Sequence, residues 1–387
     1  MTAPTPDVES RLALIRRNCA ELLTDGELQR LLESGQPLRH YIGFEISGRI
    51  HIGHGLVCMA KVADFQRAGI RCHVLLADWH TWVNDKLGGD REVIRQVALG
   101  YFADGLRAGL RCVGGDPDAV TFVLGSDLYH HNDDYWATLI EVSKHTTLAR
   151  MQRSISIMGR EEGDSIDFAK LVYPPMQVAD IFIQGINLAH AGMDQRKAHV
   201  IARDVALRLT VSPLRGAQGE LIKPVAVHHD VIMGLSAPTV PIPEGAAKRE
   251  LITAMKMSKS KPASAIFIHD DPETIARKVR KAYCPPGEVE LNPVLDWVRA
   301  LVFNIGGGPF EVGRRPENGG PVTFHDHAAV ERAYLDGSLH PMDLKTALTA
   351  WLVDTLAPAR EHFAAPQPRR RLEELERLLE PARPQRG

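Results

Sequence analysis

Residues 40–78 read HYIGFEISGRIHIGHGLVCMAKVADFQRAGIRCHVLLAD. The apolar run 40–44 predicts a buried strand, and the run 72–78 predicts a second one. Between them, the stretch after a glycine-rich turn has the spacing of an amphipathic helix that ends near Ala68. A strand, a helix and a strand in this order form the unit from which parallel sheets are built.

The same alternation continues along the chain. A helical segment near 90–111 precedes the apolar run Val120–Leu124, and further helical segments follow. We therefore predict an α/β fold whose catalytic domain is a Rossmann-like, doubly wound parallel sheet with helices on both faces. Ligands in such folds bind outside the carboxyl ends of the strands, which is where Gly43, His51 and the segment 78–80 lie.

The composition is that of an ordinary globular protein. The 387 residues are 44% hydrophobic and 24% charged, and the formal net charge of −2 neither demands nor excludes a nucleic-acid partner. No apolar stretch approaches the ~20 residues that span a bilayer, and residues 1–17 are polar, so we expect a cytoplasmic protein without a membrane partner. The five scattered cysteines have no zinc-binding spacing, so no protein-bound metal is expected.

Changes in composition predict three regions. Residues 1–235 hold an N-terminal helix and the catalytic domain. A stretch rich in proline, alanine and glycine opens a linker at 236–285 that carries a lysine-rich loop. Residues 286–387 are predicted to form a mostly helical C-terminal domain, whose tail frays from about residue 365.

The turn that opens the first helix contains His51-Ile52-Gly53-His54. Histidines three residues apart project from one side of a helix start, glycines let a phosphate approach the backbone, and the N-terminal dipole favours anions. This combination suits a nucleotide triphosphate. One alternative is a pair of surface histidines. Another is a metal site, although the glutamate of a His-Glu-x-x-His arrangement is missing.

A second motif, Lys256-Met257-Ser258-Lys259-Ser260-Lys261, follows the proline-rich stretch. Its ammonium groups can neutralise a pyrophosphate leaving group as charge develops in the transition state. A solvated basic loop is the alternative for such a cluster when it is considered alone.

The segment 173–184 predicts a helix with one polar stripe. At about 100° per residue, its polar side chains fall on one side and apolar ones on the others. The stripe consists of Tyr173, Gln177, Asp180 and Gln184. We expect a buried helix whose stripe lines a cavity, with a surface amphipathic helix as the alternative.

The segment 192–197 follows a strand-like run. Its glycine permits a close backbone approach, Asp194 offers a carboxylate for ribose hydroxyls, and Gln195 offers an amide for a substrate head group. Arg196 and Lys197 are candidate phosphate contacts.

A His-x-Gly-His turn followed about two hundred residues later by Lys-Met-Ser-Lys-Ser is the signature of class I aminoacyl-tRNA synthetases. With the segments 41–45, 75–78, 173–180 and 192–197, the chain resembles the tyrosyl-tRNA synthetases of the archaeal and eukaryotic kind over nearly its full length. The resemblance implies that L-tyrosine and ATP form tyrosyl-adenylate, with Mg²⁺ on the phosphates, and that tyrosine passes to the 3′ end of tRNA(Tyr). It also implies a homodimer whose interface includes an insertion at about 125–165.

The resemblance assigns roles to individual residues of this sequence. Catalytic roles fall to His51, His54, Lys256 and Lys259. Tyrosine binding falls to Tyr41, Leu75, Ala77, His80, Tyr173, Gln177, Asp180, Gln184 and Gln195. ATP binding falls to Gly43, Phe44, Glu45, Gly53, His54, Gly192, Asp194, Met257 and Ser258. Contacts to the tRNA acceptor stem fall to Arg150, Arg153, Arg196 and Lys197, and contacts to the anticodon fall to Phe303, His340 and Asp343.

Three departures from the family pattern lie close to the expected pocket. Ile46 stands where the family has proline, the segment 126–131 differs in length and chemistry, and Gln184 replaces a leucine. Gln184, with Tyr129 nearby, raises the alternative of a paralogue that activates a ring-substituted tyrosine. A free-standing amino-acid adenylating enzyme without a tRNA role and an inactive RNA-binding protein are further alternatives. The insertion at 236–253 has no explanation.

Overall fold

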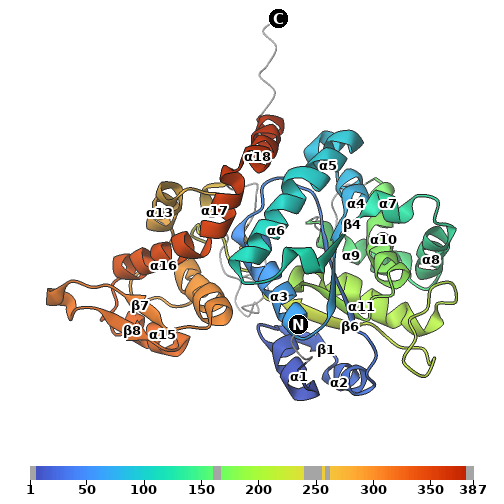
Figure 1. Ribbon diagram of the computed structural model, residues 1–387, viewed down its shortest axis with the longest axis horizontal. Helices are drawn as coiled ribbons and strands as arrows, with labels where there is room; N and C mark the ends of the chain where they lie inside the picture. The colour runs from blue at the N-terminus through green and yellow to red at the C-terminus, as the bar shows by residue number, and fades with distance from the viewer. Residues whose placement is uncertain (1–5, 160–166, 239–254, 258–261, 381–387) are drawn as a thin grey trace, which may run out of the picture.

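The computed structural model describes residues 6–159, 167–238, 255–257 and 262–380. Within these residues lies a six-stranded sheet in the order β1-β6-β5-β2-β3-β4 (Figure 1). The strands are β1 (Glu21–Leu23), β2 (Arg39–Phe44), β3 (Arg71–Leu76), β4 (Val120–Leu124), β5 (Leu188–Gly192) and β6 (Val225–His229). Strands β2 to β6 pair in parallel, and β1 pairs antiparallel with β6. The predicted parallel α/β fold is therefore confirmed.

Helices flank the sheet. Those of the catalytic region are α1 (Val8–Arg16), α2 (Asp25–Glu33), α3 (Met59–Arg67), α4 (Asp78–Val83), α5 (Arg91–Val97), α6 (Ala103–Cys112), α7 (Gly125–Tyr129), α8 (Asp133–Lys144), α9 (Leu148–Ser154), α10 (Ala169–Ile183) and α11 (Arg196–Val205). π-Helical segments occur at η1 (Gly53–Cys58), η3 (Ala98–Phe102) and η9 (Val298–Gly306). Short 3₁₀ helices are η2 (Lys86–Gly89), η4 (Pro117–Ala119), η5 (Ile155–Met158), η6 (Met193–Gln195), η7 (Ala206–Arg208), η8 (Pro262–Ser264) and η10 (Pro316–Asn318). No helix in the described ranges is long and apolar enough to cross a membrane.

The alternation of side chains along β2 divides the core into two parts. Ile42 and Phe44 join the large apolar cluster that includes residues of α3 and α6. Tyr41 points to the other face, where it joins a smaller cluster with Leu75 of β3 and Val178 of α10. Because successive residues of a strand face opposite sides, β2 contributes both to the core and to the side where α10 packs.

The C-terminal region is mostly helical, as predicted, with one small antiparallel sheet. Its elements are α13 (Pro272–Lys281), α14 (Pro293–Trp297), β7 (Phe310–Val312), β8 (Val322–Phe324), α15 (His327–Leu335), α16 (Pro341–Thr355), α17 (Ala357–Ala364) and α18 (Pro366–Leu379). Figure 1 shows most of this region to one side of the six-stranded sheet. Trp297 is fully buried, and its indole Nε1 donates a hydrogen bond to the carbonyl of Met233 at 2.8 Å. This bond ties α14 to the chain between β6 and Lys256.

The prediction that the tail frays from about residue 365 was wrong for α18. Leu375 has no exposed surface and belongs to the large core cluster, with Leu372 packed one turn earlier. The Arg371 guanidinium also forms an ion pair with Asp104 of α6 at 2.7 Å. Leucines three residues apart give the helix an apolar edge, so α18 is held by packing despite its charged sequence.

We predict that Gly109→Ala disturbs the turn that carries the His51 motif. A Cβ at Gly109 of α6 would lie 2.4 Å from the carbonyl oxygen and 2.8 Å from the Cα of Gly55 in η1. Since backbone atoms cannot yield as a flexible side chain can, we expect about 1–3 kcal/mol of destabilisation in urea unfolding. The control is Gly26→Ala in α2, where the nearest atom is 3.5 Å away. It should be neutral or slightly stabilising, and equal losses in both variants would contradict the prediction.

Candidate active site

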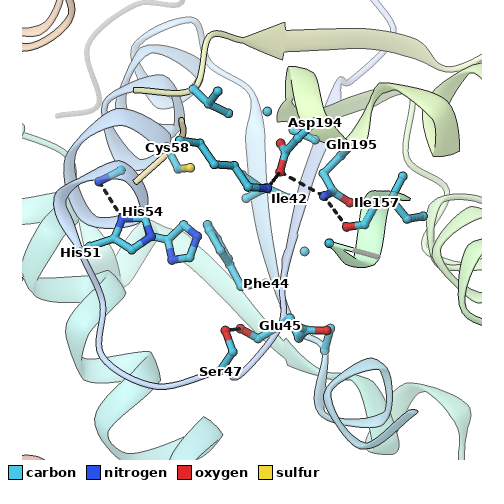
Figure 2. A pocket seen from close by; sticks show the side chains of 18 of the residues that line it. Ile42, Phe44, Glu45, Ser47, His51, His54, Cys58, Ile157, Asp194 and Gln195 are labelled. Atoms are coloured by element: carbon cyan, nitrogen blue, oxygen red, sulfur yellow. Dashed lines mark hydrogen bonds and ion pairs between the residues drawn. The ribbon is translucent and has the colours of Figure 1, made fainter. Parts of the chain in front are cut away.

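A cavity of about 700 Å³ opens at the carboxyl ends of β2 and β5. Many of the residues that the sequence singled out line it. They are Tyr41, Gly43, Phe44, Glu45, His51, Gly53, His54, Ala77, His80, Tyr173, Gln177, Asp180, Gly192, Asp194, Gln195, Lys256 and Met257. Figure 2 shows part of this wall, with His51 and His54 on one side and Asp194 and Gln195 on the other. The cavity has two chemically different ends.

One end is closed by Asp180. This side chain has no exposed surface, and its oxygens form no well-aligned hydrogen bond among the described residues, although the hydroxyls of Tyr129 and Tyr135 interact with the carboxyl. Burial raises the pKa of the Asp180 carboxyl well above its usual range. Nearby, Tyr41 is 2% exposed, and burial followed by the charge of Asp180 raises the pKa of its hydroxyl. A buried carboxyl whose oxygens lack well-aligned donors favours a ligand that brings a hydrogen-bond donor to this end.

Gly43 makes room for the Tyr41 hydroxyl. The two residues face the same side of β2, and a Cβ at position 43 would lie 2.7 Å from that hydroxyl oxygen. His80 flanks the same end, with its Nε2 3.5 Å from Asp180 Oδ2. Its imidazole is neutral, because burial lowers the pKa of His80 to about 3.

The middle of the cavity presents amide groups. The Gln177 Nε2 donates to Gln195 Oε1 at 3.4 Å, and the Gln195 Nε2 donates to the carbonyl of Ile157 at 2.8 Å. The Tyr173 and His80 rings are nearly perpendicular, with centroids 4.6 Å apart. The Gln177 Oε1 is buried, and no described residue donates to it. These acceptors suit an ammonium group.

The other end carries the His51 motif and Lys256. The His51 and His54 rings are stacked with centroids 4.3 Å apart, and His51 Nδ1 accepts a hydrogen bond from the Gly53 N–H at 3.1 Å. Across the cavity, Lys256 Nζ pairs with Asp194 Oδ2 at 2.7 Å. Burial would raise the pKa of Asp194, but the Lys256 ammonium outweighs it and holds that pKa below its usual value. Cationic and imidazole N–H groups at this end suit a phosphate ligand.

Residues 33–357 match the sequence model of the class I tRNA synthetases for tryptophan and tyrosine. The tyrosine–tRNA ligase of Thermococcus sibiricus is 55% identical over 92% of this chain and 95% of its own length. The crystal structure of the Pyrococcus horikoshii tyrosyl-tRNA synthetase complexed with L-tyrosine is 51% identical, with a TM-score of 0.91 over 95% of this chain and all of that one. The Aeropyrum pernix tyrosyl-tRNA synthetase is 40% identical with a TM-score of 0.79, over 96% of this chain and 99% of that one.

The chain belongs to the tyrosyl-tRNA synthetases. It is therefore a class I aminoacyl-tRNA synthetase, as its two basic motifs indicated.

Not every expected site residue of this synthetase lies on the cavity wall. Leu75 and Gln184 are absent from the described lining. Gln184 ends α10, and its Nε2 donates to the main-chain carbonyl of Asp180 at 2.8 Å. Tyr129 is also buried, and it stacks on Tyr135 with ring centroids 4.2 Å apart. The expected residues Ser258 and Lys259 lie outside the described residues.

The expected acceptor-stem residues are distributed over α9 and α11. Arg150 pairs with Asp204, and Arg196 pairs with Glu21 at 2.7 Å. Lys197 Nζ donates to the carbonyl of Arg153 at 2.6 Å. The synthetase thus uses several of these cations in local contacts, which an RNA phosphate would have to share or replace.

The expected anticodon residues lie in the C-terminal region. His340 caps α16, where its Nδ1 accepts a hydrogen bond from the Met342 N–H at 3.1 Å. Asp343, in the first turn of α16, has a buried Oδ2 without a partner among the described residues. Phe303 is half-buried, and its ring lies edge-on to Phe310 at 6.3 Å between centroids. The His340 side chain therefore already serves as the N-cap of α16.

Sequence reasoning missed several lining residues. Arg49, Lys86, His229 and Leu379 face the same cavity. His229 ends a row of buried imidazoles across three strands, because its Nδ1 lies 2.8 Å from His190 Nε2, and His190 Nδ1 lies 3.1 Å from His40 Nε2. A histidine pair at the end of an apolar run, His228-His229, was the one available signal. In the described part of the chain, no group of three or more potential ligands could hold a metal ion.

We predict that the free energy of unfolding of this synthetase begins to fall at a pH well above the range in which carboxylates titrate. Burial lowers the pKa of His229 to about 4 and of His80 and His269 to about 3, and it lowers the pKa values of His40, His190 and His199 well below the usual range. In the unfolded chain these six groups take up protons near pH 6.5, while in the folded chain they stay neutral. Stability is therefore fully present above about pH 7 and falls as the pH drops below 6.5.

The expected size is about 1 kcal/mol per histidine between pH 6.5 and 5.5. Asp180, whose pKa is raised, acts in the opposite direction but is one group against six. Urea unfolding at pH 7.5 and pH 5.5 measures the difference. An unchanged midpoint would show that these imidazoles are protonated in the folded state.

Proposed function

We propose that this chain activates L-tyrosine with ATP, forms tyrosyl-adenylate and pyrophosphate, and transfers the tyrosyl group to the 3′ end of tRNA(Tyr). The observation that carries the substrate assignment is the pair of Asp180 and Tyr41 at the closed end of the cavity. A phenol hydroxyl there can donate to the Asp180 carboxylate and accept from the Tyr41 hydroxyl. ATP enters as its Mg²⁺ complex at the opposite end.

The proposed roles follow the chemistry of the wall. Tyr173, Gln177 and Gln195 hold the α-amino group of tyrosine, so that its carboxylate lies near the end that carries His51 and His54. That carboxylate attacks the α-phosphate in line, and pyrophosphate leaves with its bonding electron pair. The protein supplies position and charge rather than a nucleophile. Lys256 stabilises the negative charge that develops on the pyrophosphate. Asp194, which then no longer pairs with Lys256, binds the ribose hydroxyls.

Selectivity follows from the unpaired groups at the closed end. Phenylalanine would leave the Asp180 carboxyl and the Tyr41 hydroxyl without a partner. A site built to bind a substrate hydroxyl rejects the analogue that lacks it by about 10⁴–10⁵, a magnitude for which this enzyme family is itself the established example. No editing step is then required.

The structure favours tyrosine over a ring-substituted tyrosine. Gln184 was the reason for considering the latter, but its amide hydrogen-bonds the α10 backbone, away from the cavity wall. The second candidate function is a free-standing adenylating enzyme without a tRNA role. Charging of tRNA(Tyr) by the purified chain distinguishes a tyrosine–tRNA ligase from such an enzyme. Because charging requires tRNA and ATP, we also place the reaction in the cytoplasm.

We also propose that the enzyme is a homodimer that uses the region near 125–165. Four large apolar side chains in or beside this region are exposed, namely Trp136 and Ile140 of α8, Leu148 of α9 and Phe168. Trp136 and Ile140 lie one turn apart on one face of α8. A second copy could bury this apolar surface, which equilibrium sedimentation tests directly.

We predict that Asp180→Asn and Tyr41→Phe lower tyrosine activation more than phenylalanine activation. Tyr41→Phe removes one partner of the substrate hydroxyl, and Asp180→Asn replaces a charged acceptor by a weaker neutral one. Both changes keep nearly the same volume, so kcat/KM for tyrosine in ATP–pyrophosphate exchange should fall about 10-fold or more. The ratio of tyrosine to phenylalanine activity should fall with it. Tyr283→Phe, outside the described lining, is the control for the tyrosine substitution. Equal losses with both amino acids would place the hydroxyl site elsewhere.

We predict that Asp343→Asn raises KM for tRNA(Tyr) and leaves ATP–pyrophosphate exchange unchanged. The buried Asp343 Oδ2 has no partner among the described residues, so a base amino group can supply one. Loss of a charged acceptor should cost about 10-fold in aminoacylation kcat/KM. Asp354→Asn, an exposed position on the same helix, is the matched control. A loss in the exchange assay instead would show that Asp343 supports the fold.

A further inference from the structure

Helix α18 follows the part of the chain that the family's sequence model matches. That match ends at residue 357, whereas α18 spans Pro366–Leu379. The helix nevertheless docks on the catalytic region. Its last residue, Leu379, lines the same cavity as His51 and Lys256.

Three contacts fix the position of α18. Arg371 pairs with Asp104 of α6 at 2.7 Å. Gln96 Nε2 of α5 donates to Glu374 Oε1 at 2.5 Å. Leu375 lies fully inside the large apolar cluster, which sets the rotation of the helix about its axis. The direction in which Glu376 points therefore follows from core packing.

Glu376 reaches Arg49 at the rim of the cavity. Its Oε1 lies 3.1 Å from Arg49 Nη2, and the Arg49 guanidinium lies over the Phe267 ring at 5.4 Å from the centroid. Both Arg49 and Phe267 line the cavity, and Phe267 forms a β-bridge with His51. A carboxylate and an aromatic face thus hold one guanidinium two residues before the His51 motif.

In this position, Arg49 keeps hydrogen-bond donors that Glu376 does not engage. The Glu376 pair engages Nη2, while Nε is buried and has no acceptor among the described residues. A guanidinium carries five N–H donors in a planar fork that matches the oxygens of a phosphate. An unpartnered, buried Arg49 donor beside a cavity therefore points to an anionic ligand.

We propose that α18 completes the ATP end of the active site and that Glu376 is a positioning residue, which holds Arg49 for the β- and γ-phosphates of ATP. The proposal rests on the proposed function for the assignment of this end to ATP. An arginine side chain has about four rotatable bonds, and its contacts with Glu376 and Phe267 reduce the conformations that phosphate binding would have to select. The C-terminal helix thereby acts on the reaction of the catalytic domain.

The test is ATP–pyrophosphate exchange by the full-length Glu376→Gln variant at saturating tyrosine. The substitution keeps the size of the side chain and removes its charge. Because the pair is partly exposed, we expect KM for ATP to rise about two- to five-fold, with KM for tyrosine and the thermal midpoint unchanged. Glu373→Gln, on the same helix and without a side-chain contact among the described residues, is the matched control and should behave as the unaltered enzyme.

A double-mutant cycle with Arg49→Ala shows whether Glu376 acts through Arg49. If it does, Glu376→Gln changes KM for ATP in the unaltered enzyme and has no further effect in the Arg49→Ala background. An unchanged or lowered KM for ATP, or the same change in both backgrounds, would overturn the proposal. Tyrosine-dependent ATP–pyrophosphate exchange by the unaltered enzyme tests the proposed function by itself. The test of Glu376 compares KM for ATP between the variant and the unaltered enzyme, so the two can fail independently.

Discussion

Parallel pairing of β2 with β3 on one side and with β5 on the other is the constraint on which the active site depends. The register places Tyr41 opposite His73 of β3 and Ala189 of β5, so that all three strands end at one edge of the sheet. Backbone segments from distant parts of the chain meet there, and the side of β2 that faces α10 brings Tyr41 towards Asp180. Without this pairing the polar stripe of α10 would have no opposing wall.

The two ends of the cavity differ in how they treat charge. At the closed end, burial disfavours the charged forms of the Asp180 carboxyl, the Tyr41 hydroxyl and the His80 imidazole. At the other end, Lys256 and Asp194 form a partly exposed ion pair. The buried end can recognise one substrate hydroxyl by hydrogen bonds. The more exposed end can stabilise the charge that moves from the α-phosphate to pyrophosphate during the reaction.

Local periodicity predicted much of this arrangement. The apolar runs became β2, β3 and β4, and the stripe of Tyr173, Gln177 and Asp180 lies on the cavity side of α10. The geometry of a single helix suffices to align residues four and three apart. Gln184, the next member of the stripe, departs because α10 ends there and its amide turns back to the helix backbone. Spacing alone does not say where a helix ends relative to the cavity beside it.

The sequence by itself determined the parallel α/β fold and the two basic motifs, because both depend on residues that are near one another in the chain. Only the tertiary structure decided that α18 docks on α6, that Glu376 holds Arg49, and that His229 joins a row of buried imidazoles. These contacts join polar residues that lie far apart in the chain and follow no local period. Their partners are set by how the layers of the fold pack, and this packing is decided by the whole core at once.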